Sequence, residues 1–320
     1  MKLICITPVD QIAYFKEKLI NNFETSFLIN ASKNDLKNYL LKEKSEIVFT
    51  NPNQQSFILD KNILDNTSIK IICTASTGLN HIDIEYCLRK NIKVISITRE
   101  IETLRKITST AELAFCLLLS SVRNLIVSND SVRKGNWSWE PFIGRQINSL
   151  NIGIVGYGRL GTMFANYSKS FGAKIFVYDP YIDFIDGHNR SQTLEDIFKV
   201  CDAVSLHVHA SKETHHMINE KVLKLSKEGL ILINTSRGEI VNEKDIRQFL
   251  ENGKIKHYAC DVLENEFSEK VTSSLFGLSK EKVTFTPHIG GSTIDAQKIA
   301  YNKVLEILIE ETRGINEHNS

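Results

Sequence analysis

The sequence lacks the features that mark membrane-spanning, fibrous or nucleic-acid-binding proteins. Among 320 residues there are only five prolines and two tryptophans, and no proline- or glycine-rich linker divides the chain. Lysine and arginine number 39 against 38 aspartates and glutamates, so no basic excess favours nucleic acid as a partner. No apolar run approaches the ~18 residues of a membrane span, and the N-terminus turns polar too soon for a signal peptide. We expect a cytoplasmic protein with no membrane and no nucleic-acid partner.

Cysteine is present but is not arranged for disulfides or metal binding. No two cysteines form a C-x-x-C pair, and most lie inside apolar segments. The six are Cys5, Cys73, Cys87, Cys116, Cys201 and Cys260. This distribution favours reduced, buried thiols, with a zinc or redox site as the weaker alternative.

Short apolar runs alternate with helical periodicity along almost the whole chain. The candidate strands are 3–7, 47–50, 69–74, 94–97, 152–155, 174–178, 203–208, 230–234, 258–262 and 283–286. The candidate helices include 81–90, 110–123, 160–171, 243–252 and a long amphipathic one at 292–311. Gly172 and Gly253 follow two of these helices, where a left-handed cap is common. Strand–helix alternation predicts an α/β fold with parallel sheets, and a length of ~150 residues per domain suggests two domains.

The strongest local signal is a glycine motif in the run NIGIVGYGRLG. It reads Gly156-x-Gly158-x-x-Gly161, follows a candidate strand, opens a candidate helix and leads to a second strand that ends at Asp179. Asp179 lies 18 residues after Gly161, close to the ~20 expected for an acid that binds the ribose of a dinucleotide. Gly156 would permit the tight turn, Gly158 the approach of a pyrophosphate and Gly161 the packing of the helix on the sheet.

The start of that helix completes the prediction of a dinucleotide site. At Arg159 and Leu160 the helix would direct backbone N–H groups and its positive dipole end towards phosphates. Asp179 would accept hydrogen bonds from ribose hydroxyls and repel a 2′-phosphate, which favours NAD over NADP. The alternatives are a glycine turn in another kind of α/β protein, and a flavin or S-adenosylmethionine site.

Ionisable residues follow three later strands, at the sheet edge where open α/β proteins bind ligands. Arg237 follows the run LILINTS, Glu266 follows YACDV, and His288 follows VTFTP. A histidine can take up and return the proton that moves when NAD oxidises an alcohol, and a carboxylate stabilises its protonated ring. An arginine can hold a substrate carboxylate in a planar fork. Together, Arg237, Glu266 and His288 indicate a 2-hydroxy or 2-oxo acid as the substrate.

From about Thr110 to Ala296 the sequence closely resembles the D-isomer-specific 2-hydroxyacid dehydrogenases, the family that includes D-3-phosphoglycerate dehydrogenase. The resemblance rests on STAELAFCLLLSSVRN, GIVGYGRLG, CDAVSLHVHASKETHHMI, LILINTSRGEIVNE, CDVLENE and TPHIGGST. Before Thr110 it is patchy. We expect a short form of this family, without the C-terminal regulatory domain of longer relatives.

The resemblance implies roles for individual residues. The family's catalytic arginine, glutamate and histidine fall on Arg237, Glu266 and His288. The further cofactor contacts that it implies are His207, Thr235, Ser236, Asp261, Gly290 and Gly291. It also implies that the backbone at Thr77 and Gly78 receives the substrate carboxylate.

The resemblance implies an architecture as well. It predicts two doubly wound parallel-sheet domains, with a Rossmann-type NAD domain at 104–291 inserted in a flavodoxin-like substrate domain made of 1–103 and 292–320. It implies a homodimer formed through the cofactor domains, to which 137–142 is a candidate contributor. Trp137 and Trp139 are interpreted as packing or interface anchors.

Several departures from the family keep questions open. The loop 50–55 carries no positive charge, which weakens the case for a phosphorylated substrate, although Arg99 or Lys106 could compensate. The segment 98–109 is unusually long and could reshape substrate selection. The histidines at 207, 209, 215 and 216 could suggest a metal, but the resemblance makes theirs a cofactor-side loop, and we predict no metal.

Two other functions remain possible at this point. One is an NAD(H)-sensing binding protein, like the transcriptional corepressors that resemble this family, because a fold does not fix a function. The other is an NADP-linked glyoxylate or hydroxypyruvate reductase.

Overall fold

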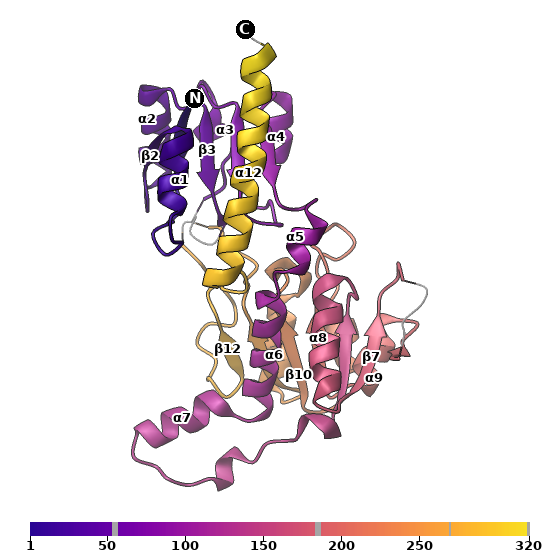
Figure 1. Ribbon diagram of the computed structural model, residues 1–320. Helices are drawn as coiled ribbons and strands as arrows, with labels where there is room; N and C mark the ends of the chain where they lie inside the picture. The colour runs from indigo at the N-terminus through magenta and orange to yellow at the C-terminus, as the bar shows by residue number, and fades with distance from the viewer. Residues whose placement is uncertain (53–56, 183–186, 269, 319–320) are drawn as a thin grey trace. The chain divides into compact units, whose positions relative to one another are not determined.

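The computed structural model describes residues 1–52, 57–182, 187–268 and 270–318 (Figure 1). Residues 53–55 of the loop singled out above lie outside the described residues. The chain divides into two compact units. The first consists of Met1–Ile107, Phe267–Lys270 and Gly291–Ser320, and the second of Thr108–Glu266 and Val271–Gly290.

The first unit is built on a five-stranded sheet in which all recorded strand pairs are parallel. Its strands are β1 (Lys2–Cys5), β2 (Glu24–Phe27), β3 (Ile47–Thr50), β4 (Ile71–Thr74) and β5 (Lys93–Ser96). Its helices are α1 (Phe15–Asn22), α2 (Lys33–Glu43), α3 (Lys61–Leu64), α4 (Ile84–Arg89), α5 (Ile101–Arg105) and α12 (Ile294–His318). The order β2-β1-β3-β4-β5 is that of a flavodoxin-like sheet.

The last helix returns to this first sheet. Helix α12 contacts α1, β4 and β5 (Figure 1). On it, Tyr301 joins Phe15 and Phe49 in a cluster with ring centroids 5.4–5.6 Å apart. The Tyr301 hydroxyl accepts a 2.7 Å hydrogen bond from the side chain of Asn51, so the buried phenol has a polar partner. These contacts make α12 part of the first core.

The second unit is built on a seven-stranded parallel sheet. Its strands are β6 (Asn151–Val155), β7 (Lys174–Tyr178), β8 (Asn189–Arg190), β9 (Ala203–Leu206), β10 (Leu230–Asn234), β11 (Ile255–Cys260) and β12 (Val283–Phe285). Its helices are α6 (Ser109–Val122), α7 (Leu125–Arg133), α8 (Arg159–Ser170), α9 (Leu194–Val200), α10 (Glu220–Lys224) and α11 (Glu243–Glu251). The order β12-β11-β10-β9-β6-β7-β8 reverses direction between β6 and β9, as in a Rossmann fold, and ligands bind at that switch point.

Apolar cores cover both faces of the second sheet. Ile152 and Ile154 of β6 pack with Phe164 on the side of α6 and α8, which lie beside each other in Figure 1. Val155, the next residue, packs on the other side with Ile197 and Leu232. All five residues of β10 are buried, as expected for a central parallel strand. The predicted fold class is therefore confirmed.

Every strand predicted from the sequence is present, and β3, β7 and β10 have the predicted bounds. The predicted strand 258–262 is wrong at both ends, since β11 ends at Cys260 and the Asp261 carboxylate turns to the following loop. Strands β2 and β8 were missed because both are edge strands with exposed or half-buried polar residues. The positive φ angles of Gly172 and Gly253, 86° and 84°, confirm the predicted caps.

Some helix predictions need correction. Helix α4 begins at Ile84 rather than near residue 81, because Asp83 caps it by accepting a 2.9 Å hydrogen bond from the Tyr86 N–H. The C-terminal helix begins at Ile294 and extends to His318, past the predicted end at 311. Helix α7 was not predicted, and it buries none of its residues.

Trp137 and Trp139 do not pack within this chain, because they are 90% and 73% exposed. Of the two roles predicted for them, packing is wrong and the interface role stays a prediction. The prediction of buried thiols is wrong for one cysteine. Cys116 on α6 is an exposed free thiol, whereas the other cysteines are buried as predicted.

Across the described ranges, no single helix is long and apolar enough to span a membrane. Residues Ile101–Val122 and Leu125–Arg133 reach that length and composition jointly, with a 61° bend between them.

Candidate active site

The glycine motif forms the turn between β6 and α8, at the switch point of the second sheet. Gly156 has φ 89°, and a Cβ there would lie 2.6 Å from the carbonyl oxygen of His207. A Cβ on Gly161 would overlap the carbonyl oxygen of Gly156, so this glycine lets the helix lie against the turn. A Cβ on Gly158 would meet nothing within 4 Å. The turn therefore needs two of its glycines for its own packing, while the third faces open space.

Helix α8 begins at Arg159, directly after Gly158. Its first N–H groups, including that of Leu160, have no carbonyl partners within the helix, and the positive end of its dipole lies at the glycine turn. Burial lowers the pKa of Arg159, whose side chain nonetheless keeps its charge at neutral pH. The start of α8 can therefore bind an anion such as a pyrophosphate.

Asp179 follows the end of β7 and reaches back to the glycine turn. One carboxylate oxygen accepts a 2.8 Å hydrogen bond from the backbone N–H of Tyr157, and the other a 2.9 Å bond from that of Tyr181. Each oxygen keeps a further lone pair with which to accept from a ribose hydroxyl. The carboxylate thus links the end of β7 to the glycine turn.

His207 follows β9 and lies beneath the turn. Its Nε2 lies 2.9 Å from Ser205 Oγ, and its ring centroid lies 5.1 Å from that of Phe164. Burial lowers the pKa of His207 to about 3, so the ring is neutral near pH 7. His209, His215 and His216 do not join it, and in the described part of the chain no three metal-ligating side chains gather.

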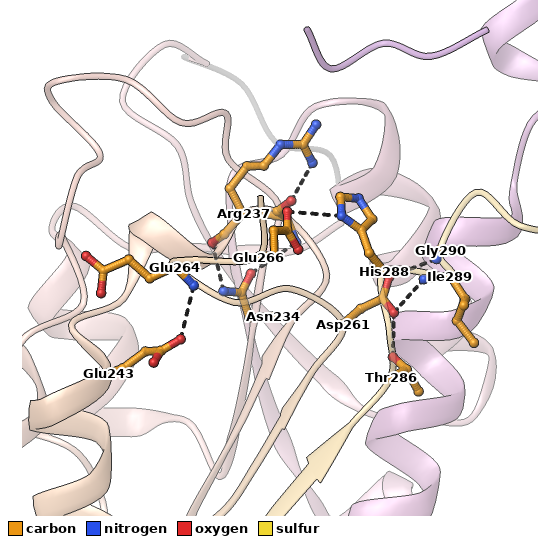
Figure 2. A network of polar contacts seen from close by, with 11 residues as sticks. Asn234, Arg237, Glu243, Asp261, Glu264, Glu266, Thr286, His288, Ile289 and Gly290 are labelled. Atoms are coloured by element: carbon orange, nitrogen blue, oxygen red, sulfur yellow. Dashed lines mark hydrogen bonds and ion pairs between the residues drawn. The ribbon is translucent and has the colours of Figure 1, made fainter. Parts of the chain in front are cut away.

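The loop after β10 is shaped by the side chain of Asn234. Its amide donates a 2.9 Å hydrogen bond to the carbonyl oxygen of Arg237, and its Oδ1 accepts a 3.0 Å bond from the Ser236 N–H (Figure 2). The Ser236 hydroxyl donates to Leu206 O at 2.6 Å, and Arg237 Nη1 donates to Ser236 O at 2.6 Å. Thr235 Oγ1 is buried and has no hydrogen-bond partner among the described residues. Such an orphaned hydroxyl is the kind of group that a bound ligand satisfies.

His288 and Glu266 form a pair. Nδ1 of His288 lies 3.1 Å from Oε1 of Glu266 (Figure 2), and their side chains are 22% and 14% exposed. His288 adopts a left-handed backbone with φ 52°. Arg237 belongs to the same network of polar contacts in Figure 2. The structure thus draws together three residues that lie up to 51 positions apart in the chain.

Asp261 holds the turn that carries His288. Its Oδ1 accepts hydrogen bonds from Thr286 Oγ1 at 2.5 Å and from the Ile289 N–H at 2.8 Å. Its Oδ2 accepts from the Gly290 N–H at 2.8 Å. Burial raises the pKa of Asp261 above its ordinary value, although these hydrogen bonds act in the opposite direction. Through the three hydrogen bonds, the carboxylate anchors the turn that carries His288.

The predicted substrate-carboxylate segment belongs to the first unit. The carbonyl oxygen of Thr77 accepts from Thr98 Oγ1 at 3.1 Å, and that of Gly78 accepts from Ser76 Oγ at 2.7 Å. A backbone N–H can donate a hydrogen bond to a carboxylate, whereas a carbonyl oxygen can only accept one. Gly291 also belongs to the first unit, whereas the other predicted cofactor contacts belong to the second.

Sequence reasoning missed residues that support the site rather than take part in it. Asn234 is the polar end of an otherwise apolar strand, which is a usable signal. Gly238 follows Arg237, and a Cβ there would overlap the backbone of Leu263 and Glu264. Glu243, whose Oε1 accepts a 3.1 Å hydrogen bond from the Glu264 N–H, gave no signal, because a glutamate at a helix start is common.

The comparisons with known proteins show the family of the chain. Residues 115–290 match the NAD binding domain of the D-isomer specific 2-hydroxyacid dehydrogenases. A glyoxylate reductase of Thermococcus litoralis is 35% identical over 277 residues, which cover 80% of this chain and 78% of that protein. The chain belongs to the D-isomer specific 2-hydroxyacid dehydrogenase family.

Further relatives extend the similarity beyond the NAD domain. A hydroxypyruvate reductase of Thermotoga maritima is 32% identical over 245 residues, which cover 76% of this chain and 78% of that protein. The crystal structure of a D-lactate dehydrogenase of Aquifex aeolicus with NAD and lactic acid is 29% identical, with a TM-score of 0.80, covering 99% of this chain and 97% of that one. The protein is therefore an NAD-dependent D-2-hydroxyacid dehydrogenase, as the resemblance implied.

The residues present fit NAD. Gly158 leaves open space at a helix start, Asp179 stands at the end of the next strand, and the buried Thr235 hydroxyl lacks a partner among the described residues. A negative charge at the end of that strand disfavours the extra 2′-phosphate of NADP.

Proposed function

We propose that the protein interconverts a D-2-hydroxy acid and the corresponding 2-oxo acid, with His288, Glu266 and Arg237 as its catalytic residues. The observation that carries the proposal is the 3.1 Å contact between Nδ1 of His288 and Oε1 of Glu266. A carboxylate at Nδ1 orients the ring and fixes its tautomer, which leaves Nε2 as the nitrogen that can exchange a proton with the substrate.

In this proposal the chain's own residues handle the proton and the substrate. During reduction His288 donates a proton from Nε2 to the 2-oxo oxygen, and during oxidation it accepts the proton of the 2-hydroxyl group. Arg237 binds the substrate carboxylate and polarises the neighbouring carbonyl. When bound, NADH supplies the hydride that reduces the 2-oxo carbon, and NAD accepts it in the reverse direction.

The remaining predicted contacts take supporting roles in the proposal. The backbone N–H groups of Thr77 and Gly78 bind the substrate carboxylate. The cofactor contacts are Gly156, Gly158, Arg159, Leu160, Gly161, Asp179, His207, Thr235, Ser236, Asp261, Gly290 and Gly291. Since the relatives named above act on glyoxylate and hydroxypyruvate, we propose a small unphosphorylated 2-oxo acid as the substrate.

Steady-state NADH oxidation with glyoxylate, hydroxypyruvate, pyruvate and phosphorylated 2-oxo acids tests the proposal. His288→Ala should lower kcat by ~10²–10⁴-fold while NADH fluorescence still reports binding. Arg237→Ala should lose oxoacid turnover and affinity. Arg89→Ala, an exposed arginine of the first unit, is the control and should behave as wild type. Unchanged turnover in His288→Ala would contradict the proposal.

The same assay separates the enzyme from a binding protein. NADH binding without oxidation in the presence of any of these acids would indicate an NAD(H)-sensing protein instead. NADPH is compared with NADH at equal concentration, and a preference for NADPH would contradict the role of Asp179.

We also propose a homodimer formed through the second unit. Helix α7 buries no residue, and in the segment after it Trp137, Trp139 and Ile143 are 90%, 73% and 68% exposed. Exposed aromatic side chains of this kind anchor interfaces. Light scattering should give about twice the chain mass of 36.4 kDa, and Trp139→Ser should lower it. A monomeric mass for the wild type would rule the dimer out.

We propose a cytoplasmic location on the state of the cysteines. All six are free, including the exposed Cys116, and free thiols persist in reducing compartments. Cell fractionation with an antibody to the protein tests this, and recovery with an extracytoplasmic fraction would contradict it.

A further inference from the structure

Glu243 is a buried carboxylate for which the proposed reaction has no direct use. It is the first residue of α11 and only 4% exposed. In the described part of the chain it forms no ion pair with a lysine or arginine. A buried carboxylate needs hydrogen bonds or opposite charge to compensate for the loss of water. Its hydrogen bonds show which parts of the chain the carboxylate holds in place.

Both oxygens of Glu243 are used, and they hold two points of the chain on either side of Glu266. Oε1 accepts a 3.1 Å hydrogen bond from the backbone N–H of Glu264, and Oε2 accepts a 2.6 Å bond from the Ser273 hydroxyl (Figure 2 shows the first). Glu264 precedes Glu266 by two residues. One carboxylate at the start of α11 therefore binds the chain two residues before Glu266 and again seven residues after it.

Glu264 is held from two further directions. Its side chain accepts a 2.7 Å hydrogen bond from Nε2 of His216, and its backbone lies against Gly238. These contacts hold the start of the segment, and Glu243 differs from them in that it also binds Ser273. Glu243 thus joins the backbone two residues before Glu266 to the Ser273 hydroxyl.

We infer that Glu243 is a positioning residue that holds Glu266 against His288. The inference rests on the proposed function, because it assigns Glu243 to the acid–base pair named there. Displacing a catalytic group by about 1 Å can cost ~10²-fold in rate, so a lost anchor is expected to lower kcat more than it raises KM. Glu243 acts through the Glu264 N–H and does not touch the substrate.

The chemistry of the anchor distinguishes two substitutions. In Glu243→Gln the amide oxygen can accept from the Glu264 N–H while the amide NH₂ donates to Ser273 Oγ, so both contacts survive. In Glu243→Ala both are lost and the Glu264 N–H loses its partner. If Glu243 acts by positioning, Glu243→Gln should keep the kcat that Glu243→Ala loses. If the negative charge itself is required, Glu243→Gln should lose kcat as well.

The test combines kinetics with a spectroscopic measurement. The His288 N–H that faces Glu266 should give a downfield proton resonance in NMR, assigned by its absence in Glu266→Gln and His288→Ala. Glu243→Ala should lose or broaden this resonance and lower kcat by ~10–10²-fold, while Glu243→Gln keeps both within about twofold of wild type. Glu251→Ala, exposed on the same helix, is the control.

The outcomes decide the inference separately from the proposed function. A resonance and kcat at wild-type level in Glu243→Ala would overturn it, as would a glutamine variant as impaired as alanine. If Glu243→Ala does not fold, Ser273→Ala serves as the test instead. A retained His288 resonance with wild-type kcat in Ser273→Ala overturns the inference. A broadened resonance with reduced kcat supports it. If the wild type is inactive with every acid, the proposed reaction is refuted. The His288 N–H resonance can still be measured, because NMR needs no turnover, so the positioning by Glu243 is tested separately.

Discussion

Gly238 and Leu263 lie so close that a side chain on residue 238 would overlap the carbonyl carbon of Leu263. Gly238 directly follows Arg237, and Leu263 begins the segment that reaches Glu266. The loop after β10 and the loop after β11 are therefore in backbone contact. Arg237 and Glu266 are therefore carried by loops that pack backbone against backbone, with no room for a side chain between them.

This contact predicts that Gly238→Ala impairs catalysis. The new methyl group must push the two loops apart, so kcat should fall at least tenfold, with a loss of stability of ~1–3 kcal/mol from overpacking. Oxoacid turnover and thermal unfolding measure the two effects. Gly314→Ala, where an added Cβ would meet nothing within 4 Å, is the control. A Gly238→Ala variant with wild-type kcat would mean that the loops adapt independently.

The sequence predicted the parts of this site that depend on strand ends. Arg237, Glu266 and His288 each follow an apolar run, and parallel strands bring such ends to one edge of a sheet. It could not predict Gly238 or Glu243, because their roles arise from contacts between segments 20 or more residues apart. It also missed the edge strand β2, since Glu24–Phe27 carries no buried apolar run. The spacing of apolar residues indicates which face of a helix or strand is buried. A close approach between two loops produces no such spacing, so the sequence does not reveal it.

The glycine turn gives a matched pair of substitutions. Gly156→Ala places a Cβ 2.6 Å from His207 O at φ 89°, so it should destabilise the fold by ~1–3 kcal/mol. Gly158→Ala places its Cβ in open space at a φ of −73°, so the fold should keep its stability. In the proposal that space receives the pyrophosphate, and Gly158→Ala should raise the Kd for NADH about tenfold or more. Urea unfolding and NADH fluorescence titration separate the effects, and unchanged NADH affinity would place the pyrophosphate elsewhere.

Asp261→Asn should loosen the turn that carries His288. The aspartate accepts three hydrogen bonds, from Thr286, Ile289 and Gly290. An asparagine has one acceptor oxygen and turns an NH₂ group towards a backbone N–H, which leaves a buried donor unpaired. We expect a loss of ~1–3 kcal/mol in the free energy of unfolding and a lower kcat. Calorimetry and kinetics measure both, and a variant with wild-type stability would show that the turn holds without the carboxylate.

His207 predicts how stability depends on pH. Its pKa is about 3 in the folded protein against 6.5 for the ordinary side chain, because burial disfavours the charged ring. Between these values the unfolded chain binds a proton that the folded chain does not, so acidification favours unfolding. Stability should fall as pH drops through 6.5 and continue to fall towards 3.

The size of this effect can be isolated with His207→Asn. One such histidine accounts for at most about 2 kcal/mol of lost stability between pH 7 and pH 5, and asparagine cannot titrate. The free energy of unfolding of the variant should therefore decline less over this interval than that of the wild type. His257, whose pKa burial also lowers, contributes a decline in the same direction to both proteins. Urea unfolding at pH 7, 6 and 5 gives the two slopes, and equal slopes would show that the ring of His207 reaches water in the folded state.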